Sequence, residues 1–156
     1  MVLMPRQVWV RLLVWRPADS ARPFDISRGW PRVLHVVKDD VPGLPEVVLR
    51  PGEPLRLAAA RVAAALGMRA AEDLPRMLAL DQWPPQAGGD VDQMVLILDG
   101  GMSPTDTLPP CGECGYSHVA WASMDAVEPA TSHALRALVG HSLPPILWRG
   151  EPGGAG

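Results

Sequence analysis

Prolines and glycines divide this chain into short apolar segments, and this division limits what the chain can fold into. Its 156 residues include 18 prolines and 15 glycines. No uninterrupted apolar run is longer than Met94–Leu98, whereas a membrane-spanning helix needs about 20 apolar residues. We therefore expect a globular protein made of short strands and helices, with no transmembrane segment. Its length suits one domain around a single core.

The composition and the charge exclude several classes of protein. Apolar residues make up 47% of the chain and charged residues 20%, which is ordinary for a globular protein. The formal net charge is −3, so no basic field would attract the phosphates of a nucleic acid. The first residues carry Arg6 and Arg11 inside an apolar stretch and no basic region ahead of it, unlike a signal peptide. We expect a cytoplasmic protein with neither a membrane nor a nucleic acid as partner.

Six segments rich in β-branched, aliphatic and aromatic residues are predicted to be strands. Prolines, glycines and charged residues bound these segments, because such residues interrupt a strand. Two longer loops are expected at Arg16–Pro31 and Gln82–Asp90. The predicted strands are Gln7–Trp15, Arg32–Lys38, Glu46–Arg50, Met77–Leu80, Val91–Asp99 and Ser117–Ala122.

Two segments have the pattern of helices. Pro54 suits the first position of a helix that runs to Leu66, and Gly67 suits its left-handed end. A second helix is predicted at Thr131–Val139, capped by Thr131 or Ser132 and closed by Gly140. The order of strands, helix, strands and helix predicts an α+β fold, an α/β/α sandwich with a mixed β-sheet.

The segment LPEVVLRPGEPLRLAAARVAAALG, Leu44–Gly67, resembles a known motif, the Nudix box G-x5-E-x7-R-E-U-x-E-E-x-G-U. The Leu-Pro pair that usually precedes the box stands in place, Gly52-Glu53 matches its first acid, and Arg61 follows at the required spacing. Downstream, residues 79–101 and 117–127 resemble segments of Nudix hydrolases from high-GC bacteria. The resemblance runs from about residue 32 to residue 150. It implies a single Nudix-like domain over residues 1–150. Residues 151–156, at the end of the chain, are expected to be a disordered tail.

The chain departs from the box where the box carries its helical glutamates. With Arg61 as the box arginine, the glutamate positions hold Val62, Ala65 and Leu66. A register shifted by one residue puts Ala60 at the arginine and Arg61, Ala64 and Ala65 at the glutamates, so the carboxylates are missing in both registers. Mg²⁺ and Mn²⁺ need clustered oxygen ligands. We therefore expect the usual metal-dependent diphosphate hydrolysis to be lost or severely weakened, and we expect no cofactor.

Three residues are candidates for catalysis. Glu53 keeps its family position, where it is either a remnant metal ligand or an acid that favours a helix N-terminus. Glu113 lies in a loop from which, in the resembling hydrolases, an acid can reach the active site as a base or a metal ligand. Strand alternation places His118 on the face opposite Trp121, so His118 is either an acid–base group of the cleft or a structural histidine. His35 has the same two interpretations.

Four residues are candidates for substrate binding. Arg61 could bind an anionic ligand or face solvent. Asp81, Trp83 and Asp92 flank a loop that helps shape the substrate pocket in the family, and Trp83 could stack on a planar ligand or cover the edge of the core. A separate cluster, C-x2-C-x3-H from Cys111 to His118, is a structural loop, a zinc site or a thiol pair.

Three functions remain open at this point. The first is a Nudix fold whose cleft has been repurposed for metal-independent acid–base chemistry on a small organic metabolite, as an isomerase, cyclase or lyase of secondary metabolism. The second is a residual nucleoside diphosphate hydrolase that holds Mg²⁺ or Mn²⁺ through Glu53, Glu113 and a loop aspartate. The third is a non-catalytic module that binds a ligand or regulates a partner. The expected partner is a small molecule, and the resemblance is also compatible with a homodimer.

Overall fold

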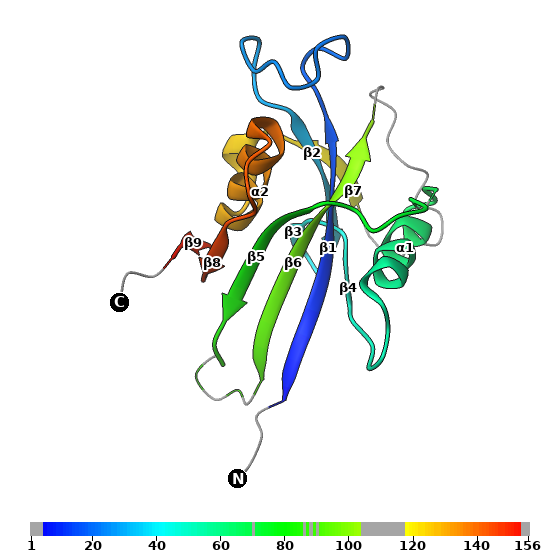
Figure 1. Ribbon diagram of the computed structural model, residues 1–156, viewed down its shortest axis with the longest axis vertical. Helices are drawn as coiled ribbons and strands as arrows, with labels where there is room; N and C mark the ends of the chain where they lie inside the picture. Colours follow the sequence, from blue (N-terminus) through cyan, green and yellow to red (C-terminus); the bar gives the residue numbers. More distant parts are fainter. Residues whose placement is uncertain are drawn as a thin grey trace.

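The computed structural model describes residues 5–69, 71–85, 87, 89, 91–103 and 118–153. Within this part, nine strands, two α-helices and one short 3₁₀ helix are present, and Figure 1 shows their arrangement. In chain order the elements are β1 (Arg6–Arg16), β2 (Arg32–Lys38), β3 (Val41–Gly43), β4 (Glu46–Val48), α1 (Leu55–Ala65), β5 (Met77–Trp83), β6 (Asp92–Met102), β7 (His118–Ala122), η1 (Met124–Ala126), α2 (Pro129–Gly140), β8 (Ile146–Trp148) and β9 (Glu151–Pro152). No helix among these residues is long and apolar enough to span a membrane.

The strands form one mixed sheet in which β1 is central. The order along the sheet is β3-β2-β1-β6-β5-β8-β9, with β4 paired to β1 and β7 paired to β2. Strand β1 runs parallel to β6, and β5 runs parallel to β8, while the other pairs are antiparallel. The expected α+β fold with a mixed sheet is confirmed.

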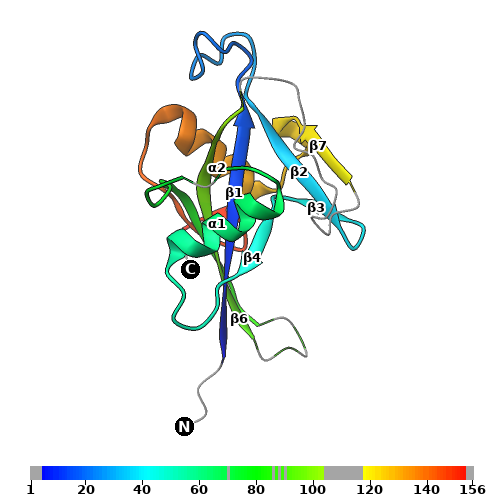
Figure 2. The same ribbon diagram turned by 90° about the vertical axis from the view of Figure 1, so that its right-hand side faces the viewer.

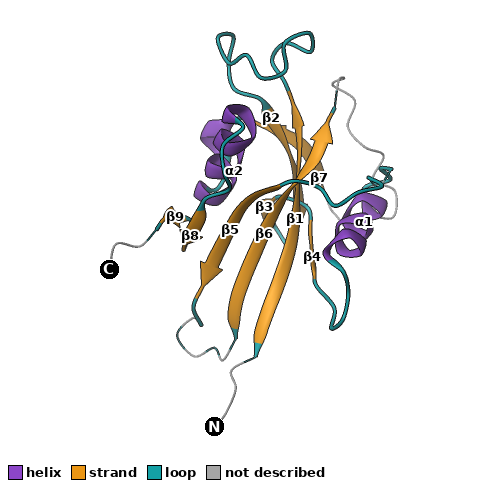
Figure 3. Cartoon of the chain, in the orientation of Figure 1, coloured by secondary structure: helices purple, strands orange, loops and turns teal. Residues whose placement is uncertain are grey.

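The two helices cover opposite faces of this sheet (Figures 1, 2 and 3). Alternate residues of β1 divide between the two sides, as strand geometry requires. Val10, Leu12 and Val14 pack with α1, whereas Leu13 and Trp15 pack with α2. The sheet is therefore buried on both faces, which makes three layers and two apolar clusters.

One edge of β1 is shared by two strands. At its C-terminal end β1 pairs with β2, with Trp15 opposite Val33. Closer to its N-terminal end β1 pairs with β4, with Trp9 opposite Val48. The other edge of β1 is occupied by β6 along almost its whole length. Strands β2 and β4 pair with different parts of the same edge of β1, and the sheet is split between them. Beyond this split, β2, β3 and β7 turn away from the other strands (Figure 1). This parting shapes the site described below.

Several element boundaries differ from the predicted ones. Helix α2 begins at Pro129, where proline suits the first turn, and Glu128 rather than Thr131 or Ser132 is its N-cap residue. The residue that closes this helix in the left-handed conformation is His141, with φ 49°, and not Gly140. Strand β5 continues through Trp83, so the first two residues of the loop predicted at Gln82–Asp90 belong to a strand.

Three short strands were not expected. The segments β3, β8 and β9 are too short to show a period of two in the sequence, and pairing with neighbouring strands defines them. Residues 151 and 152, expected in a disordered tail, pair with β8 as β9. Helix α1 follows the prediction closely, since it begins after Pro54 and Gly67 takes the left-handed conformation with φ 68°.

Candidate functional site

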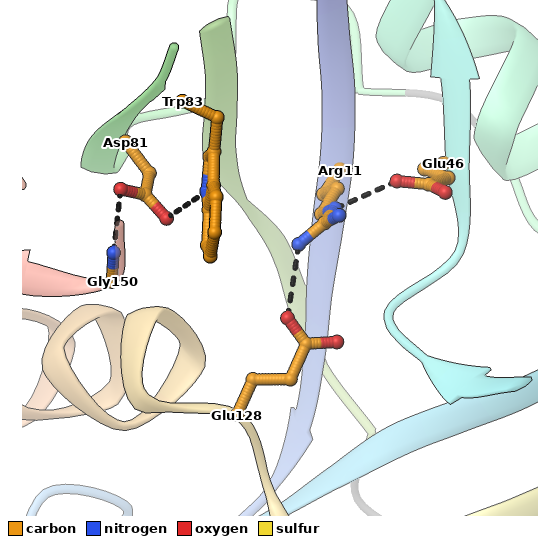
Figure 4. Close-up of polar contacts among 6 residues, drawn as sticks. All are labelled: Arg11, Glu46, Asp81, Trp83, Glu128 and Gly150. Carbon is orange, nitrogen blue, oxygen red and sulfur yellow. Dashed lines mark hydrogen bonds and ion pairs between the residues drawn. The ribbon is translucent and has the colours of Figure 1, made fainter. Parts of the chain in front are cut away.

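An arginine stands in the middle of the apolar strand β1. Arg11 lies between Trp9 and Leu13 on the face of the sheet that carries α2. Its Nε donates to Oε2 of Glu46 at 2.7 Å, and its Nη1 donates to Oε2 of Glu128 at 3.2 Å (Figure 4). Glu46 is the residue directly opposite Arg11 on β4, and Glu128 caps the start of α2. One guanidinium thus joins three elements that are distant in sequence.

A hollow of about 360 Å³ opens beside this arginine, at the parting of the sheet. A cavity of this size suits a small organic molecule. Its wall includes Trp9 and Leu44 as apolar surfaces and Arg11, Glu46 and Glu128 as charged groups. The side chains of Glu46 and Glu128 are 31% and 43% exposed, and that of Arg11 is 20% exposed, so all three can meet a ligand. We call this hollow, with its three charged residues, the Arg11 cleft.

A buried histidine lies next to the Arg11 cleft. His35 is on the α2 face of β2 and is 8% exposed, and its Nε2 has no hydrogen-bond partner among the described residues. Burial lowers the pKa of His35 below its ordinary value, and the negative charge of Glu128 partly opposes this effect. The hydroxyl of Thr131, in the first turn of α2, is also buried without a partner in this part of the chain. These two atoms are polar positions inside the otherwise apolar core.

Glu53 and Arg61 form a two-pronged ion pair on the other side of the sheet, with α1. Nε of Arg61 donates to Oε2 of Glu53 and Nη2 donates to Oε1, both at 2.8 Å. The same Nη2 donates to the carbonyl of Val48 at 2.8 Å, and Glu53 also accepts from the backbone N–H of Arg50. The hydrogen bonds from Arg61, then that from Arg50, lower the pKa of Glu53 from 4.5 to about 2. This pair ties the loop before α1 to the helix and to β4.

Asp81 and Trp83 are brought together on the face that carries the Arg11 cleft (Figure 4). Asp81 is 2% exposed, and its Oδ2 accepts from Nε1 of Trp83 at 2.8 Å. Its Oδ1 accepts from the backbone N–H of Gly150 at 2.9 Å, which fastens the β8–β9 turn to the sheet. Both carboxylate oxygens of Asp81 are therefore engaged in holding the structure. Asp92, by contrast, pairs with Arg6 at the beginning of β6 and β1, at 2.7 Å.

The remaining candidates are only partly placed. His118 begins β7 opposite Val37 and is exposed, and the register sets it on the same face of the sheet as His35. Val119 and Trp121 pack toward α1 instead, so the predicted alternation along this strand is confirmed. Glu113, Cys111 and Cys114 lie outside the described residues.

Helix α1 does not fit a divalent cation. Its buried face consists of alanine and aliphatic side chains, and its sequence LRLAAARVAAA contains no carboxylate. Such a surface offers none of the oxygen ligands that Mg²⁺ or Mn²⁺ requires. Among the residues that the structure describes, no group of three or more His, Cys, Asp or Glu side chains lies close enough to hold a metal ion.

The sequence analysis did not single out Arg11, Glu46 or Glu128. A signal was present, because Arg11 interrupts the apolar stretch VWVRLLVW of a strand that is buried on both faces. A charge at such a position needs a partner, since an unpaired buried charge is costly. Its two partners lie 35 and 117 positions away, and no local pattern points to them.

Comparisons with known proteins connect this architecture to solved structures. No family model matches the sequence, and no curated protein matches it. A MutT protein from Methanosarcina mazei superposes with a TM-score of 0.57 at 14% identity, covering 90% of this chain and 97% of that one. A mutT/nudix family protein from Listeria innocua gives a TM-score of 0.56 at 11% identity, covering 89% and 98%. At these identities the likeness concerns the fold.

The coverage is less complete for another solved structure. A MutT/nudix family protein from Enterococcus faecalis gives a TM-score of 0.53 at 16% identity over 78% of this chain. The matched region makes up only 44% of that protein, so this chain spans less than half of its length.

Replacing Glu53 with glutamine should reveal the ion pair through its pH dependence. The lowered pKa means that the pair stabilises the fold fully above the ordinary value of 4.5, and that this stability is lost as the pH falls toward about 2. At pH 7 we expect Glu53→Gln to melt a few degrees below the unmodified chain, and the difference should shrink between pH 4.5 and 2.5. Thermal unfolding followed by circular dichroism measures both, with the exposed Glu72→Gln as control. A difference that persists unchanged in acid would contradict the assignment.

Replacing Asp81 with alanine tests whether the Asp81 carboxylate holds the structure together. The change leaves the N–H groups of Trp83 and Gly150 without their acceptor in a buried place, which costs about 2–4 kcal/mol of unfolding free energy. Asp92→Ala breaks an exposed ion pair with Arg6 and should cost less than about 1 kcal/mol. Urea denaturation of both variants gives the two values. Equal small losses would show that Asp81 is free for a ligand.

Replacing Glu128 with glutamine should move the titration of His35. Glu128 supplies the negative charge that raises the pKa of His35 against the effect of burial. Without that charge, we expect the pKa of His35 to fall further below 6.5. An NMR titration of the histidine ring protons measures the shift, and Glu72→Gln should leave it unaltered. An unchanged or raised pKa of His35 in Glu128→Gln would contradict the electrostatic interaction between Glu128 and His35.

Proposed function

We propose that this chain, which has the Nudix fold, carries out metal-independent acid–base chemistry on a small organic metabolite in the Arg11 cleft. The observation that carries the proposal is Arg11 itself, held between two carboxylates at the wall of a hollow of about 360 Å³. The reaction classes that suit such a site are isomerisation, cyclisation and elimination, because each requires a proton to be removed and another returned.

The character of α1 supports a site elsewhere than on this helix. In the Nudix box, helical glutamates hold the metal that assists the reaction, and here Val62, Ala65 and Leu66 occupy those positions. Val62 and Leu66 are fully buried in the core, so this face of α1 serves packing. A cation that could assist a reaction has to come from another side chain. Arg11 provides a permanent one on the opposite face of the sheet.

The charged groups of the Arg11 cleft can take different roles in a proton transfer. A carboxylate of Glu128 or Glu46 takes a proton from the carbon beside a substrate carbonyl, as a general base. Arg11 donates hydrogen bonds to the oxygen on which negative charge develops, and this stabilises the enolate. The carboxyl group that has taken up this proton returns it to a different atom of the substrate and is a carboxylate again. The substrate thereby keeps its composition and changes the position of a hydrogen atom.

His35, which is buried and interacts with the charge of Glu128, is compatible with this division of roles. Because burial lowers its pKa, the imidazole is neutral at neutral pH. A neutral ring does not compete with Arg11 for the charge of Glu128. His35 is therefore proposed as a positioning residue, since it is buried and is not among the described residues that line the hollow.

The residues predicted from the sequence enter the proposal in different ways. His118 is exposed at the start of β7 and is not among the described residues that line the hollow, and it is kept here as a proposed acid–base group. Glu113 also remains a candidate. Glu53 and Arg61 are proposed to position the loop before α1, because they engage each other.

The proposed chemistry can be tested by hydrogen exchange. The chain is incubated in D₂O with a panel of small ketones and 2-oxo acids, and exchange of carbon-bound hydrogen is followed by proton NMR. We expect exchange on a subset of the panel, and Glu128→Gln should slow it by about 10²-fold or more. Arg11→Gln should slow it as well, while the exposed Arg136→Gln should leave it unchanged.

The same preparation separates the two alternative functions. The retained Glu53–Arg61 pair favours a residual hydrolase, and a C. elegans Ap4A hydrolase is among the solved structures of similar fold, with a TM-score of 0.54 at 14% identity. A ligand-binding module has a structural counterpart in the NUDIX domain of Shewanella oneidensis NrtR, solved with ADP ribose, with a TM-score of 0.53. Mg²⁺-dependent phosphate release from nucleotides, abolished in Glu53→Gln, would replace the proposal by the first. Binding of ADP-ribose without turnover would replace it by the second.

A further inference from the structure

A second hollow, of about 640 Å³, lies where the end of β1, the start of β2 and the end of β7 meet. Its wall includes three arginines and two tryptophans, namely Arg16, Arg28, Trp30, Arg32 and Trp121. No residue lines both this hollow and the Arg11 cleft. We call it the arginine–tryptophan pocket. Its volume falls within the range of small-molecule sites in proteins.

The strand register gathers part of this pocket on one face of the sheet. Arg16 and Arg32 are direct partners across the β1–β2 pair, and Trp121 is the partner of Leu34 on β7. Since side chains two positions apart point to the same side, Arg32 and Trp121 are diagonal neighbours. They lie on the face that carries α1, whereas Arg11 and Glu128 lie on the face that carries α2. The pocket is therefore separate from the Arg11 cleft in both position and orientation.

Positive charge dominates the pocket although the whole chain is acidic. Arg28 and Arg32 are exposed and form no ion pair with any residue that the structure describes. Asp25 accepts from the backbone N–H of Ser27 at 2.9 Å and also interacts with the charge of Arg28, so it balances that charge in part. Guanidinium groups in this arrangement suit a carboxylate or a phosphate.

The two tryptophans add a second kind of recognition. Trp30 packs in part on the apolar cluster under α2, and Trp121 packs in part on the cluster under α1. Both are half-buried, and both also line the hollow. Packing on the core fixes an indole ring, so that little conformational entropy is lost when a planar group stacks on it. The pocket thus combines half-buried aromatic surfaces with exposed cationic side chains.

We infer that the arginine–tryptophan pocket binds a small aromatic anion, that is, a planar ring bearing a carboxylate or a phosphate. The arginines contact the oxyanion, and Trp30 and Trp121 contact the ring. This site is independent of the chemistry proposed for the Arg11 cleft.

Calorimetric titration of the full chain with four probes tests the inference. The probes are phenyl phosphate, benzoate, inorganic phosphate and benzyl alcohol, which separate the ring from the charge. We expect phenyl phosphate, benzoate or both to bind at least about tenfold more tightly than inorganic phosphate and benzyl alcohol. The comparison of benzoate with phenyl phosphate decides which oxyanion is preferred.

Three variants assign the binding to this pocket. Arg32→Gln should weaken the aromatic anion about tenfold or more, and Trp30→Leu should reduce its affinity toward that of inorganic phosphate. Arg136→Gln, an exposed arginine on α2, should leave the affinity unchanged. Thermal melting checks that each variant is folded, and Arg28→Gln replaces any that is not. Absence of binding by both aromatic anions, equal binding of inorganic phosphate, or binding unaffected by the pocket variants would each overturn the inference.

Discussion

Strand β1 is the constraint on which the rest of the structure depends, because it is paired on both edges and covered on both faces. Strand β6 follows one edge, while β2 and β4 divide the other between them. Strands β2 and β4 pair with different parts of this edge, and the sheet opens between them beside β1 (Figure 1). Both hollows border this strand. Arg11 faces the cleft on the α2 side, and Arg16, of opposite parity, faces the pocket on the α1 side.

An arginine at position 11 is energetically unfavourable in a strand that is covered on both faces. Placing a guanidinium and two partly exposed carboxylates here removes part of their hydration, and the attraction between them does little more than balance that cost. An aliphatic residue at this position would pack between Trp9 and Leu13 without any such penalty. A contribution to the stability of the fold is therefore a weak explanation for the ion pairs of Arg11 with Glu46 and Glu128. A role in binding or chemistry explains why a charged network occupies the apolar strand, and its partial exposure to the hollow is consistent with that role.

The sequence predicted those parts of the molecule that local patterns specify. Strands β1 and β2 follow from their β-branched residues, and α1 follows from Pro54, its apolar spacing and Gly67. The spacing of the Nudix box singled out Glu53 and Arg61, but their ion pair with each other was not predicted and is seen only in the structure. The Arg11 cleft could not be found in this way, since Glu46 and Glu128 become its neighbours only through the pairing of β1 with β4 and the packing of α2. Short strands such as β8 are likewise defined by their partners.

The two faces of the sheet now differ in what their helices supply. Helix α1 brings alanine and aliphatic side chains to its face, where Ala58, Val62 and Leu66 complete an apolar cluster. The ion pair between Glu53 and Arg61 keeps the loop of the box in place beside a helix that offers no carboxylate. Helix α2 brings a carboxylate at its N-cap to the other face, next to a buried histidine and an arginine. The loop pair and the apolar packing, rather than carboxylates, hold α1 on the sheet. The titratable groups that remain close together are those around Glu128, and for this reason the proposed chemistry lies on the α2 side.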